Sequence, residues 1–517
     1  MAVVCVDAGT TMIKVAGYAD DGTELVVVRR PTEVSRPAPG HAEQDMAAVW
    51  RAVADGVREV AGRLATATGT GTGTGIDFLA LTAQGDGCWP VDRAGDPAGP
   101  AILWNDGRAG AVVEEWSRAG VLGEAFRANG SLTFAGLPNA ILTWLRARDP
   151  DRLARMSAAL TCGGWLFARL TGEIAADGSD ASAPFLDIRA LRYSDELLRL
   201  YGMEWARPLL PPLRGDGERV AALRPDAAAE LGLAAGTPVV LAPYDIAATA
   251  IGVGAVDTGQ ACTILGTTLC TETVVESPAL DGEPSGLTIA MGLPGRYLRA
   301  FPTLAGGQVV DWACRVLGLA GDPRGLAELA ARAPAGAGGL VFLPYLSPAG
   351  ERAPFLDPRA RGAFHGLTVE HEREHLARAV LEGLSLVVRD CLTAAGTRPT
   401  ELRVSGGGSA SPVWLGMLAD ATGVPVVRSA DTEPGARGAF IVGLLATGRA
   451  VDARAAADAH VRPGDVHEPD PGRAAHYTAA YQDFLDVRRA TGPAWPTLAA
   501  LRARTGPTGP APDGTRP

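Results

Sequence analysis

The sequence predicts a two-domain α/β protein, and three observations support that fold class. The chain has 517 residues, which exceeds the ~250–300 residues at which a single core stops growing, so we expect two domains of comparable size. Apolar patterns typical of strands alternate along the chain with patterns typical of helices. A unit of strand, Gly-Thr-Thr turn and strand occurs near the N-terminus and again at 261–275, which indicates two domains of related design that face one another.

The first half begins with a predicted β-meander, because its apolar residues alternate between turn residues. A helix follows on regular apolar spacing, and the low-complexity run TATGTGTGTG at 66–75 connects it to the next strand. The predicted strands are 3–7, 13–19, 24–29 and 76–82, and the predicted helices are 46–65, 107–118, 139–148, 162–171 and 195–202.

The second half begins after a buried strand and a helix rich in small residues. We expect an N-terminal domain over 1–250, a C-terminal domain over 251–490 and a disordered tail over 491–517, because the tail is rich in proline and glycine. The further predicted elements are a strand at 236–241, a helix at 246–254, a strand-turn-strand at 261–275, a helix at 369–394, a strand that ends at SGGG (405–408) and helices at 411–422 and 434–448.

Composition and charge exclude several classes of function. The net charge of −11 argues against nucleic acid or an acidic membrane surface as the main partner. No apolar run reaches the ~18 residues of a membrane span, and the N-terminus does not resemble a signal peptide. The seven cysteines form no C-x-x-C pair, which favours reduced thiols in a cytoplasmic protein.

The two Gly-Thr-Thr turns are the first candidate site. A tight turn exposes backbone N–H groups, and threonine hydroxyls add donors, so such a turn can hold a phosphate. One turn alone is equally a plain hairpin, but two turns after apolar strands favour a nucleotide clamp. The first turn also carries Asp7 and Lys14, the only lysine in the chain. The glycines of SGGG could admit a flat adenine or ribose, or merely form a flexible loop.

Polar residues at strand ends form the second candidate site. Asp245 lies where a buried strand gives way to a helix, so it is either a helix N-cap or a carboxylate aimed into a cleft. TAQGDGCW (82–89) and AILWNDGRA (101–109) combine carboxylates, amides and tryptophan. These groups suit a ligand rich in hydroxyl groups, although each segment could also be a capped strand end or helix start.

Several of these segments together resemble the FGGY carbohydrate kinases, which belong to the superfamily that contains actin. The resemblance covers roughly residues 1–450 and rests on DAGTTMIK, ILWNDGRA, LGTTL, LPYLSPAGERAPFLDPRARGAFHGL and SGGGSASPVWLGMLAD, in that order. It implies two ribonuclease-H-like domains, each a mixed five-stranded sheet flanked by helices, with a cleft between them. ATP would enter from the C-terminal domain and the sugar from the N-terminal one.

The resemblance also implies a role for individual residues. Asp245 would be the catalytic base, and Asp7 would lie near Mg²⁺. The substrate would contact Gln84, Gly85, Asp86, Trp104, Asn105 and Asp245. The nucleotide would contact Thr10, Thr11, Lys14, Gly266, Thr267, Gly307, Asp311, Gly407 and Ser411.

The implied activity is ATP-dependent phosphorylation of a terminal hydroxyl of a short polyol or ketose. The form QGDG followed by Trp89 looks more like erythritol kinases than like xylulokinases, which usually show Gln-Met-His-Gly there. Xylulokinase, L-xylulose kinase and a non-catalytic, ATP-gated sugar sensor remain as alternatives. The sequence leaves the oligomeric state open, and a homodimer is compatible with it.

Overall fold

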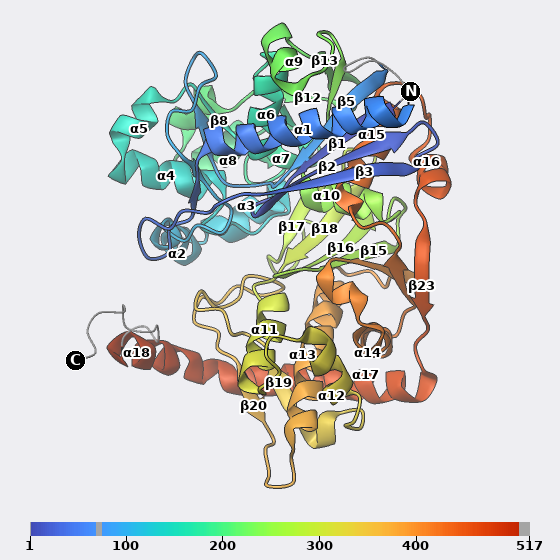
Figure 1. The fold of residues 1–517 in the computed structure, drawn as a ribbon. Helices are drawn as coiled ribbons and strands as arrows, with labels where there is room; N and C mark the ends of the chain where they lie inside the picture. The colour runs from blue at the N-terminus through green and yellow to red at the C-terminus, as the bar shows by residue number, and fades with distance from the viewer. Residues whose placement is uncertain (1, 69–74, 506–517) are drawn as a thin grey trace, which may run out of the picture.

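The computed structural model describes residues 2–68 and 75–505, so most of the connector TATGTGTGTG lies outside the described residues. Two halves are visible, each built around one large mixed sheet (Figure 1). The predicted two-domain α/β fold is confirmed. Within the described ranges, no helix is both long and apolar enough to cross a membrane.

The sheet of the first half has six strands in the order β13-β14-β5-β1-β2-β3. The first three strands form an antiparallel meander, and β5 runs parallel to β1 on its other side. The bounds are β1 (Ala2–Ala8), β2 (Met12–Ala19), β3 (Glu24–Pro31), β5 (Ile76–Ala83), β13 (Val220–Ala222) and β14 (Pro238–Leu241).

The sheet of the second half has seven strands in the order β17-β18-β16-β15-β21-β22-β23. The strands β15, β16 and β18 repeat the antiparallel meander, and β21 runs parallel to β15. The bounds are β15 (Gln260–Leu265), β16 (Leu269–Val275), β17 (Leu287–Ala290), β18 (Tyr297–Pro302), β21 (Glu401–Ser405), β22 (Val426–Ser429) and β23 (Pro463–His467).

The prediction of five strands in each sheet is wrong in number, because additional strands pair with the edges. β13 extends the first sheet, and β17 and β23 extend the second. Without them, the orders β3-β2-β1-β5-β14 and β18-β16-β15-β21-β22 share one topology. The repeated strand-turn-strand of the sequence is therefore the start of the same five-strand core in each half.

The two sheets and the helices form five layers: helices, the first sheet, a central helix layer, the second sheet and further helices. Both faces of each sheet are buried, because alternate residues of a strand face opposite sides of a sheet. One core lies between the first sheet and helices α1 (Met46–Thr68), α6 (Cys162–Thr171) and α9 (Pro225–Leu231). A second core lies between the two sheets, around α10 (Asp245–Gly252) and α15 (Pro434–Ala446). A third joins the second sheet to α11 (Gly307–Val316), α12 (Pro323–Ala330), α13 (Arg373–Ala394) and α14 (Pro412–Thr422).

Helices α10 and α15 cross at very short range, since small residues line both. A Cβ on Gly438 would lie 1.8 Å from the carbonyl oxygen of Ala248, and a Cβ on Gly252 would lie 1.8 Å from that of Pro434. Only glycine allows backbones to approach so closely. Although α15 comes late in the chain, it also contacts β1 and β5 of the first sheet.

Smaller elements complete the two halves. A helical insertion with its own core covers one end of the first half, through α2 (Gly110–Arg118), α3 (Val121–Asn129), α4 (Pro138–Arg148) and α8 (Asp195–Leu200). Further short helices are α5 (Pro150–Arg155), α7 (Gly178–Ala181) and α16 (Ala453–His460). The two-stranded sheets pair β4 (Glu43–Gln44) with β7 (Ala101–Ile102), β6 (Trp89–Val91) with β8 (Ala158–Leu160), β9 (Ala176–Asp177) with β12 (Leu213–Arg214), β10 (Leu186–Asp187) with β11 (Arg192–Tyr193), and β19 (Val341–Leu343) with β20 (Ala363–His365).

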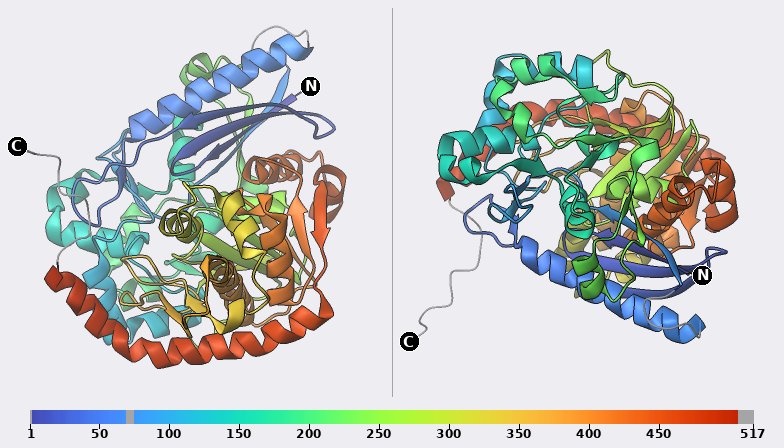
Figure 2. Two further views of the ribbon diagram at one scale, coloured as in Figure 1. Left: turned by 60° about the horizontal axis from the view of Figure 1, so that its bottom comes forward. Right: turned by 90° about the horizontal axis from the view of Figure 1, so that it is seen from above.

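The C-terminal region differs from the prediction of disorder over 491–517. Helix α17 (Pro471–Thr491) runs along the second half and continues through a short 3-10 turn into α18 (Trp495–Thr505), which extends outward from it (Figures 1 and 2). Trp495 is only 4% exposed, and its ring lies 5.9 Å from those of Tyr345 and Phe355. The prediction is therefore wrong for 491–505, because one aromatic side chain anchors a polar helix, and 506–517 lie outside the described residues.

Candidate active site

The first Gly-Thr-Thr turn holds an ion cluster at the end of β1. Asp7 and Lys14 are directly paired across β1 and β2, and the Nζ atom of Lys14 lies 3.2 Å from Oδ2 of Asp7 and 3.5 Å from Oε2 of Glu433. The Asp7 carboxylate raises the pKa of Lys14 above its ordinary value, although burial acts in the other direction. Lys14 therefore stays charged and neutralises two buried carboxylates.

Glu433 belongs to the other end of the chain, immediately before helix α15. It also pairs with Arg29 of β3. A Cβ on Gly435, in the first turn of α15, would lie 2.7 Å from Oδ2 of Asp7. The Asp7 carboxylate thus lies beside a helix N-terminus, where the helix dipole favours negative charge.

A hydrogen-bond network joins the same turn to the predicted substrate segments. The hydroxyl of Thr10 donates to Oε1 of Gln84 at 2.8 Å, and the indole N–H of Trp104 donates to that hydroxyl at 2.9 Å. Gln44 links the two sides, because its amide donates to the carbonyl oxygen of Thr10 and accepts from Gln84. The predicted phosphate-binding and substrate-binding residues are therefore in direct contact here.

Asp245 is the first residue of α10, directly after the loop that ends β14. Burial raises the pKa of its carboxyl to about 7, and the negative charge of Asp7 acts in the same direction. The backbone N–H of Ile246 and the charge of Lys14 oppose this rise. A carboxylate with a pKa near neutrality has the proton affinity that a general base needs.

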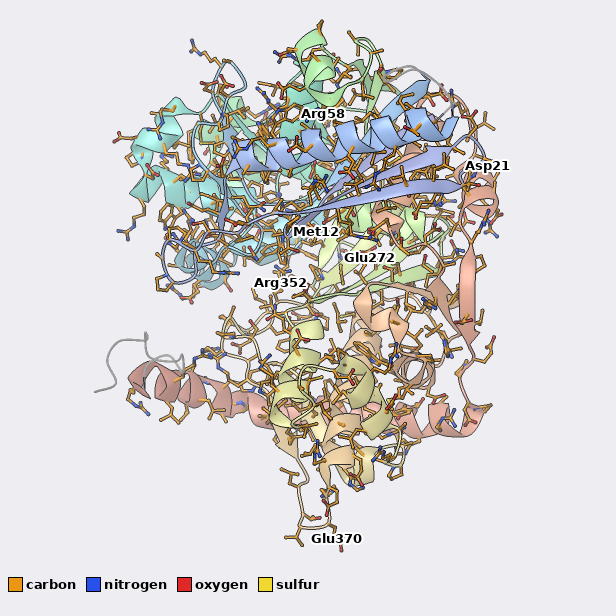
Figure 3. All side chains as sticks on the ribbon, viewed as in Figure 1. Met12, Asp21, Arg58, Glu272, Arg352 and Glu370 are labelled. Atoms are coloured by element: carbon orange, nitrogen blue, oxygen red, sulfur yellow. The ribbon has the colours of Figure 1, made fainter. Side chains whose placement is uncertain are left out.

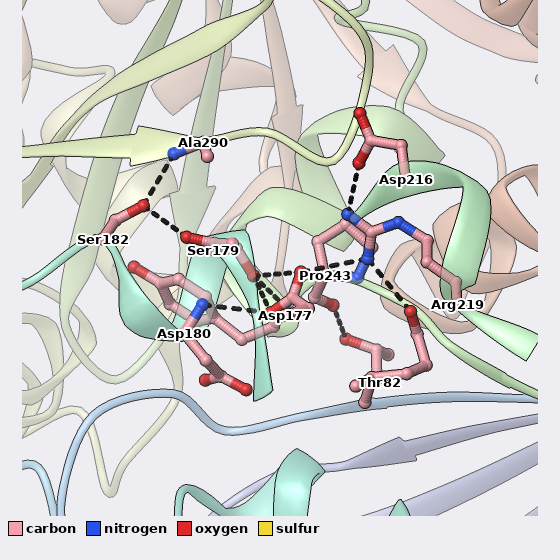
Figure 4. Close-up of polar contacts among 12 residues, drawn as sticks. Thr82, Asp177, Ser179, Asp180, Ser182, Asp216, Arg219, Pro243 and Ala290 are labelled. Atoms are coloured by element: carbon pink, nitrogen blue, oxygen red, sulfur yellow. Dashed lines mark hydrogen bonds and ion pairs between the residues drawn. The ribbon is translucent and has the colours of Figure 1, made fainter. Parts of the chain in front are cut away.

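Buried polar contacts fix the backbone before Asp245 (Figure 4). The hydroxyl of Ser179 donates to Asp177 and accepts from the backbone N–H of Tyr244 at 3.0 Å. Thr82 donates to the carbonyl oxygen of Pro243 at 2.6 Å. Arg219 neutralises Asp177, since its Nη1 lies 3.1 Å from the carboxylate.

Asp86 lies on the loop that follows β5, and its backbone is held in a left-handed conformation. Its φ angle is +56°, which is uncommon for any residue other than glycine. The preceding residue, Gly85, lies flat against Tyr244, because an added Cβ would meet the ring at 2.2 Å. Burial raises the pKa of Asp86 to about 7, and the charge of Arg352 partly offsets this effect.

Arg352 lies where the two halves face each other (Figure 3). Its guanidinium group lies 5.0 Å from the ring centre of Trp104 and 4.7 Å from that of Phe134. Its Nε donates to the carbonyl oxygen of Pro302 at 2.8 Å. The preceding carboxylate, Glu351, accepts from the backbone N–H groups of Leu304 and Arg352 and so holds the loop in shape.

The second Gly-Thr-Thr turn lies against the N-terminus of α11. The backbone N–H of Gly307 donates to the carbonyl oxygen of Gly266 at 2.9 Å, and that of Gln308 donates to Thr267 at 3.1 Å. A Cβ on Gly307 would lie 2.7 Å from the Gly266 carbonyl oxygen, so glycine is required there. Gly406 of the SGGG segment approaches Leu265 equally closely.

A cavity of about 270 Å³ opens beside the second turn, on the face of α11. Its lining residues are Leu304, Gln308, Val309, Asp311, Trp312, Arg315, Leu346, Ser347 and Pro348. The predicted nucleotide contact Asp311 is therefore in this wall, and its side chain is exposed. Ser411 instead caps α14, since its hydroxyl accepts from the backbone N–H of Trp414 at 3.3 Å.

The other residues predicted to contact substrate or nucleotide make fewer contacts within the protein. Thr11, Asn105 and Thr267 are exposed, and Gly407 has nothing within 4 Å of an added Cβ. Asp106, next to Asn105, has a structural role, because it accepts hydrogen bonds from the backbone N–H of Ala42 and from Arg108.

Sequence reasoning did not select three residues of the site: Gln44, Glu433 and Arg352. Gln44 lies on an irregular strand with no motif around it. Arg352 lies in GERAP, within one of the segments that resemble the FGGY family. That resemblance is the sequence feature that could have identified Arg352 as a site residue. Glu433 precedes Pro434 and Gly435, and this pattern predicts the start of a helix. It does not reveal that Glu433 pairs with Lys14 and Arg29.

Comparison with known proteins agrees with this arrangement. Residues 2–252 match the N-terminal domain of the FGGY family of carbohydrate kinases, and residues 261–447 match its C-terminal domain. An erythritol kinase from Brucella abortus (strain 2308) is 31% identical, over 96% of this chain and 98% of that protein. A xylulose kinase from Escherichia coli (strain K12) is 32% identical, over 81% of this chain and 84% of that protein.

A crystal structure of xylulose kinase from Rhodospirillum rubrum has the same fold, with a TM-score of 0.85. It is 28% identical in sequence, and the match covers 96% of this chain and 100% of that one. The chain belongs to the FGGY family of carbohydrate kinases and is a phosphotransferase that uses an alcohol group as acceptor.

Proposed function

We propose that this protein phosphorylates a terminal hydroxyl of a short polyol or ketose with ATP, and that erythritol is its preferred substrate. The observation that carries the proposal is Asp245, a carboxyl with a pKa of about 7 at the start of α10. The charges of Asp7, Lys14 and Asp86 all act on this carboxyl. Geometry supports the same conclusion, because Asp7 is paired with Thr82 of β5, and the hydroxyl of Thr82 donates to the carbonyl oxygen of Pro243, two residues before Asp245.

Each residue then has a role in the transfer. Asp245 accepts the proton of the terminal hydroxyl as its oxygen attacks phosphorus, which is the general-base step of phosphoryl transfer. Lys14, Thr10, Thr11 and Thr267 bind phosphate oxygens of the nucleotide. Gly307, Asp311, Gly407 and Ser411 contact the remainder of the nucleotide, and Asp311 lies in the wall of the cavity on α11.

Asp7 has the chemistry to order Mg²⁺, which would neutralise charge on the transferred phosphoryl group. Lys14 occupies one oxygen of its carboxylate, Oδ2, so the other oxygen remains for a cation or its water shell. The described residues contain no group of three or more metal-binding side chains. This fits Mg²⁺, which is usually bound by one or two carboxylates together with phosphates and water.

The substrate proposal rests on Asp86, Gln84 and Trp104. A carboxylate at position 86 can accept hydrogen bonds from two adjacent hydroxyl groups, and the indole of Trp104 limits the length of the pocket. The similar protein from Brucella abortus is described as an erythritol kinase. Similar proteins are also described as xylulose kinases and a probable L-xylulose kinase, so these activities are the second candidate.

Steady-state kinetics with glycerol, erythritol, xylitol, D-xylulose, L-xylulose and gluconate test the substrate. We expect erythritol to give the highest kcat/KM, and a higher value for either xylulose would refute that choice. We also propose a cytoplasmic location, which the seven buried, free cysteines support. A homodimer is a further proposal, which light scattering tests directly.

The variant Asp245→Asn tests the base. We expect a loss of kcat of roughly 10²–10⁴-fold, the usual contribution of general-base catalysis. Asp195→Asn is a matched control, because Asp195 also begins a helix but its side chain is 76% exposed. Unchanged kcat in Asp245→Asn would exclude Asp245 as the base. Binding of polyol without any transfer by the unaltered protein would indicate a sensor.

A further inference from the structure

Arg352 reaches into the substrate region of the first half from the second half. Its loop follows β19 and is held by the Glu351 hydrogen bonds described above. The two rings against its guanidinium, Trp104 and Phe134, both belong to the first half. Trp104 in turn donates to Thr10 of the phosphate turn. Arg352 is therefore a contact between the halves at the substrate site.

The guanidinium group keeps unused donors at this position. Its Nε donates to the carbonyl oxygen of Pro302, and two aromatic rings cover it. In the part of the chain that the structure describes, no carboxylate forms an ion pair with Arg352. Arginine has five N–H donors, so the terminal NH₂ groups are available to a ligand.

Asp86 is the complementary unpartnered group in the first half. Among the described residues, no hydrogen bond or ion pair is formed by its carboxylate. A Cβ on the next residue, Gly87, would lie 3.3 Å from the backbone nitrogen of Trp104, and the guanidinium group of Arg352 lies 5.0 Å from the ring centre of the same Trp104. Asp86 and Arg352 therefore lie on either side of Trp104 without forming a direct contact, and the charge of Arg352 acts on the Asp86 carboxyl. A positive φ at Asp86 also costs conformational energy. Residues in such conformations are concentrated at functional sites, which supports a ligand-binding role for the Asp86 side chain.

We propose that Arg352 is a substrate-binding residue that determines specificity for polyols with adjacent hydroxyl groups. One hydroxyl of the polyol donates to Asp86, and the oxygen of its neighbour accepts from Arg352. The ligand thereby bridges the two halves, because it contacts Asp86 of the first half and Arg352 of the second. This inference rests on the proposed function, because it assigns a contact to the substrate of that reaction.

A hydroxyl group fits this position better than a phosphate does. A phosphate bound to Arg352 would lie beside the Asp86 carboxylate, and like charges at short range are destabilising. A hydroxyl can donate to one partner and accept from the other, which matches the opposite chemistry of Asp86 and Arg352.

The variants Arg352→Met and Arg352→Lys test the inference with erythritol and butane-1,2,4-triol, which lacks one of its inner hydroxyl groups. We expect Arg352→Met to lower kcat/KM for erythritol roughly 10- to 100-fold, the range for one hydrogen bond to a charged group. The preference for erythritol over the triol should shrink by a similar factor. Arg352→Lys keeps the positive charge but lacks the planar guanidinium group with its fixed N–H donors, so we expect an intermediate loss of kcat/KM.

Arg359→Met is the matched control on the same segment, because its side chain is 55% exposed and pairs only with Asp357. Calorimetric binding of ADP with Mg²⁺ should stay within about twofold in every variant, which also shows that each is folded. Undiminished discrimination between erythritol and the triol in Arg352→Met would overturn the inference. A larger loss for ADP than for polyol would overturn it too, since Arg352 would then bind phosphate.

The proposed function can fail separately from this inference. If the unaltered protein transfers phosphate to no polyol or ketose, the function is wrong before any variant is assayed. If another sugar of the panel is the best substrate, the same comparison uses that sugar and its analogue without one inner hydroxyl. If the unaltered protein is active and Arg352→Met equals it, only the inference is wrong.

Discussion

Lys14 is the only lysine of the chain, so amine-directed reagents modify its Nζ and the N-terminal amine and no other group. The neutral amine is the nucleophile that attacks such reagents, so the rate follows the fraction of amine that has lost its proton. Asp7 and Glu433 stabilise the charged form of Lys14. We therefore predict that Lys14 is modified more slowly in the folded protein than in the unfolded chain.

The distances give the size of this effect. At 3.2 Å from Asp7 and 3.5 Å from Glu433, each attraction is roughly 5 kcal/mol at an effective dielectric constant of about 20. Burial and partial exposure of Lys14 offset most of it, which leaves about 1–3 kcal/mol in favour of the charged amine. Since 1.36 kcal/mol corresponds to one pKa unit, the rate should fall roughly 5- to 150-fold.

Mass spectrometry of protein treated with formaldehyde and a borohydride at pH 8.5 measures both amines at once. The N-terminal amine serves as the internal control, and protein in concentrated urea gives the reference rate. The variant Glu433→Gln removes one attraction, so Lys14 should be modified faster in it. ADP with Mg²⁺ should slow the reaction at Lys14 further if the amine binds phosphate.

A rate at Lys14 within twofold of that in urea would refute the ion cluster as a source of stabilisation. The sign also fixes the pH range. Because the pKa of Lys14 is raised in the folded state, the stabilisation is complete below its ordinary value of about 10.4 and disappears as pH rises through the higher folded value. Protection without any effect of ADP would assign Lys14 a structural role only.

Three further predictions concern the base, the helix crossing and the C-terminal helix. Because Asp245 acts when deprotonated and its pKa is about 7, kcat/KM for polyol should fall tenfold per pH unit below about pH 7; an acid limb near pH 4 would contradict this. Gly438→Ala should destabilise the protein by about 3 kcal/mol or more in thermal unfolding, since its Cβ meets backbone at 1.8 Å; Gly416→Ala, in open space on α14, is the control and should be neutral or stabilising. Trp495→Ala should cost about 3–5 kcal/mol and raise KM for polyol more than for ATP, because its ring supports the loop of Arg352; Leu498→Ala, 42% exposed, is the control.

The parts of the site that the sequence predicts are those with local signals. The turn at Asp7 and the strand-to-helix junction at Asp245 each combine a hydrophobic strand with small and acidic residues within a few positions. The fold class follows for the same reason, since the strand-turn-strand unit occurs in both halves. Local patterns therefore locate Asp245 and suggest what surrounds it.

The residues that the sequence does not reveal are those that meet only after folding. Glu433 is more than 400 positions from Asp7, and Arg352 is about 250 positions from the ring of Trp104. No local pattern encodes such a pairing, because it depends on which faces of the sheets are covered and by which helices. The C-terminal helix shows the same limit: a stretch rich in proline becomes ordered because Trp495 fits against Tyr345 and Phe355.

We predict that the crossing of α10 and α15 links stability to nucleotide binding. Helix α15 begins at the residue after Glu433, and its backbone meets that of α10 at Gly438 and Gly252. A displacement of α15 by even 1 Å would move Glu433 and Gly435 away from the Asp7–Lys14 pair. Because that pair belongs to the first half and α15 lies in the sequence of the second, the ion cluster at the proposed phosphate-binding turn is complete only while both halves are packed together. Gly438→Ala should therefore weaken ADP binding as well as lower the unfolding temperature, whereas a role confined to packing would leave ADP affinity unchanged below that temperature.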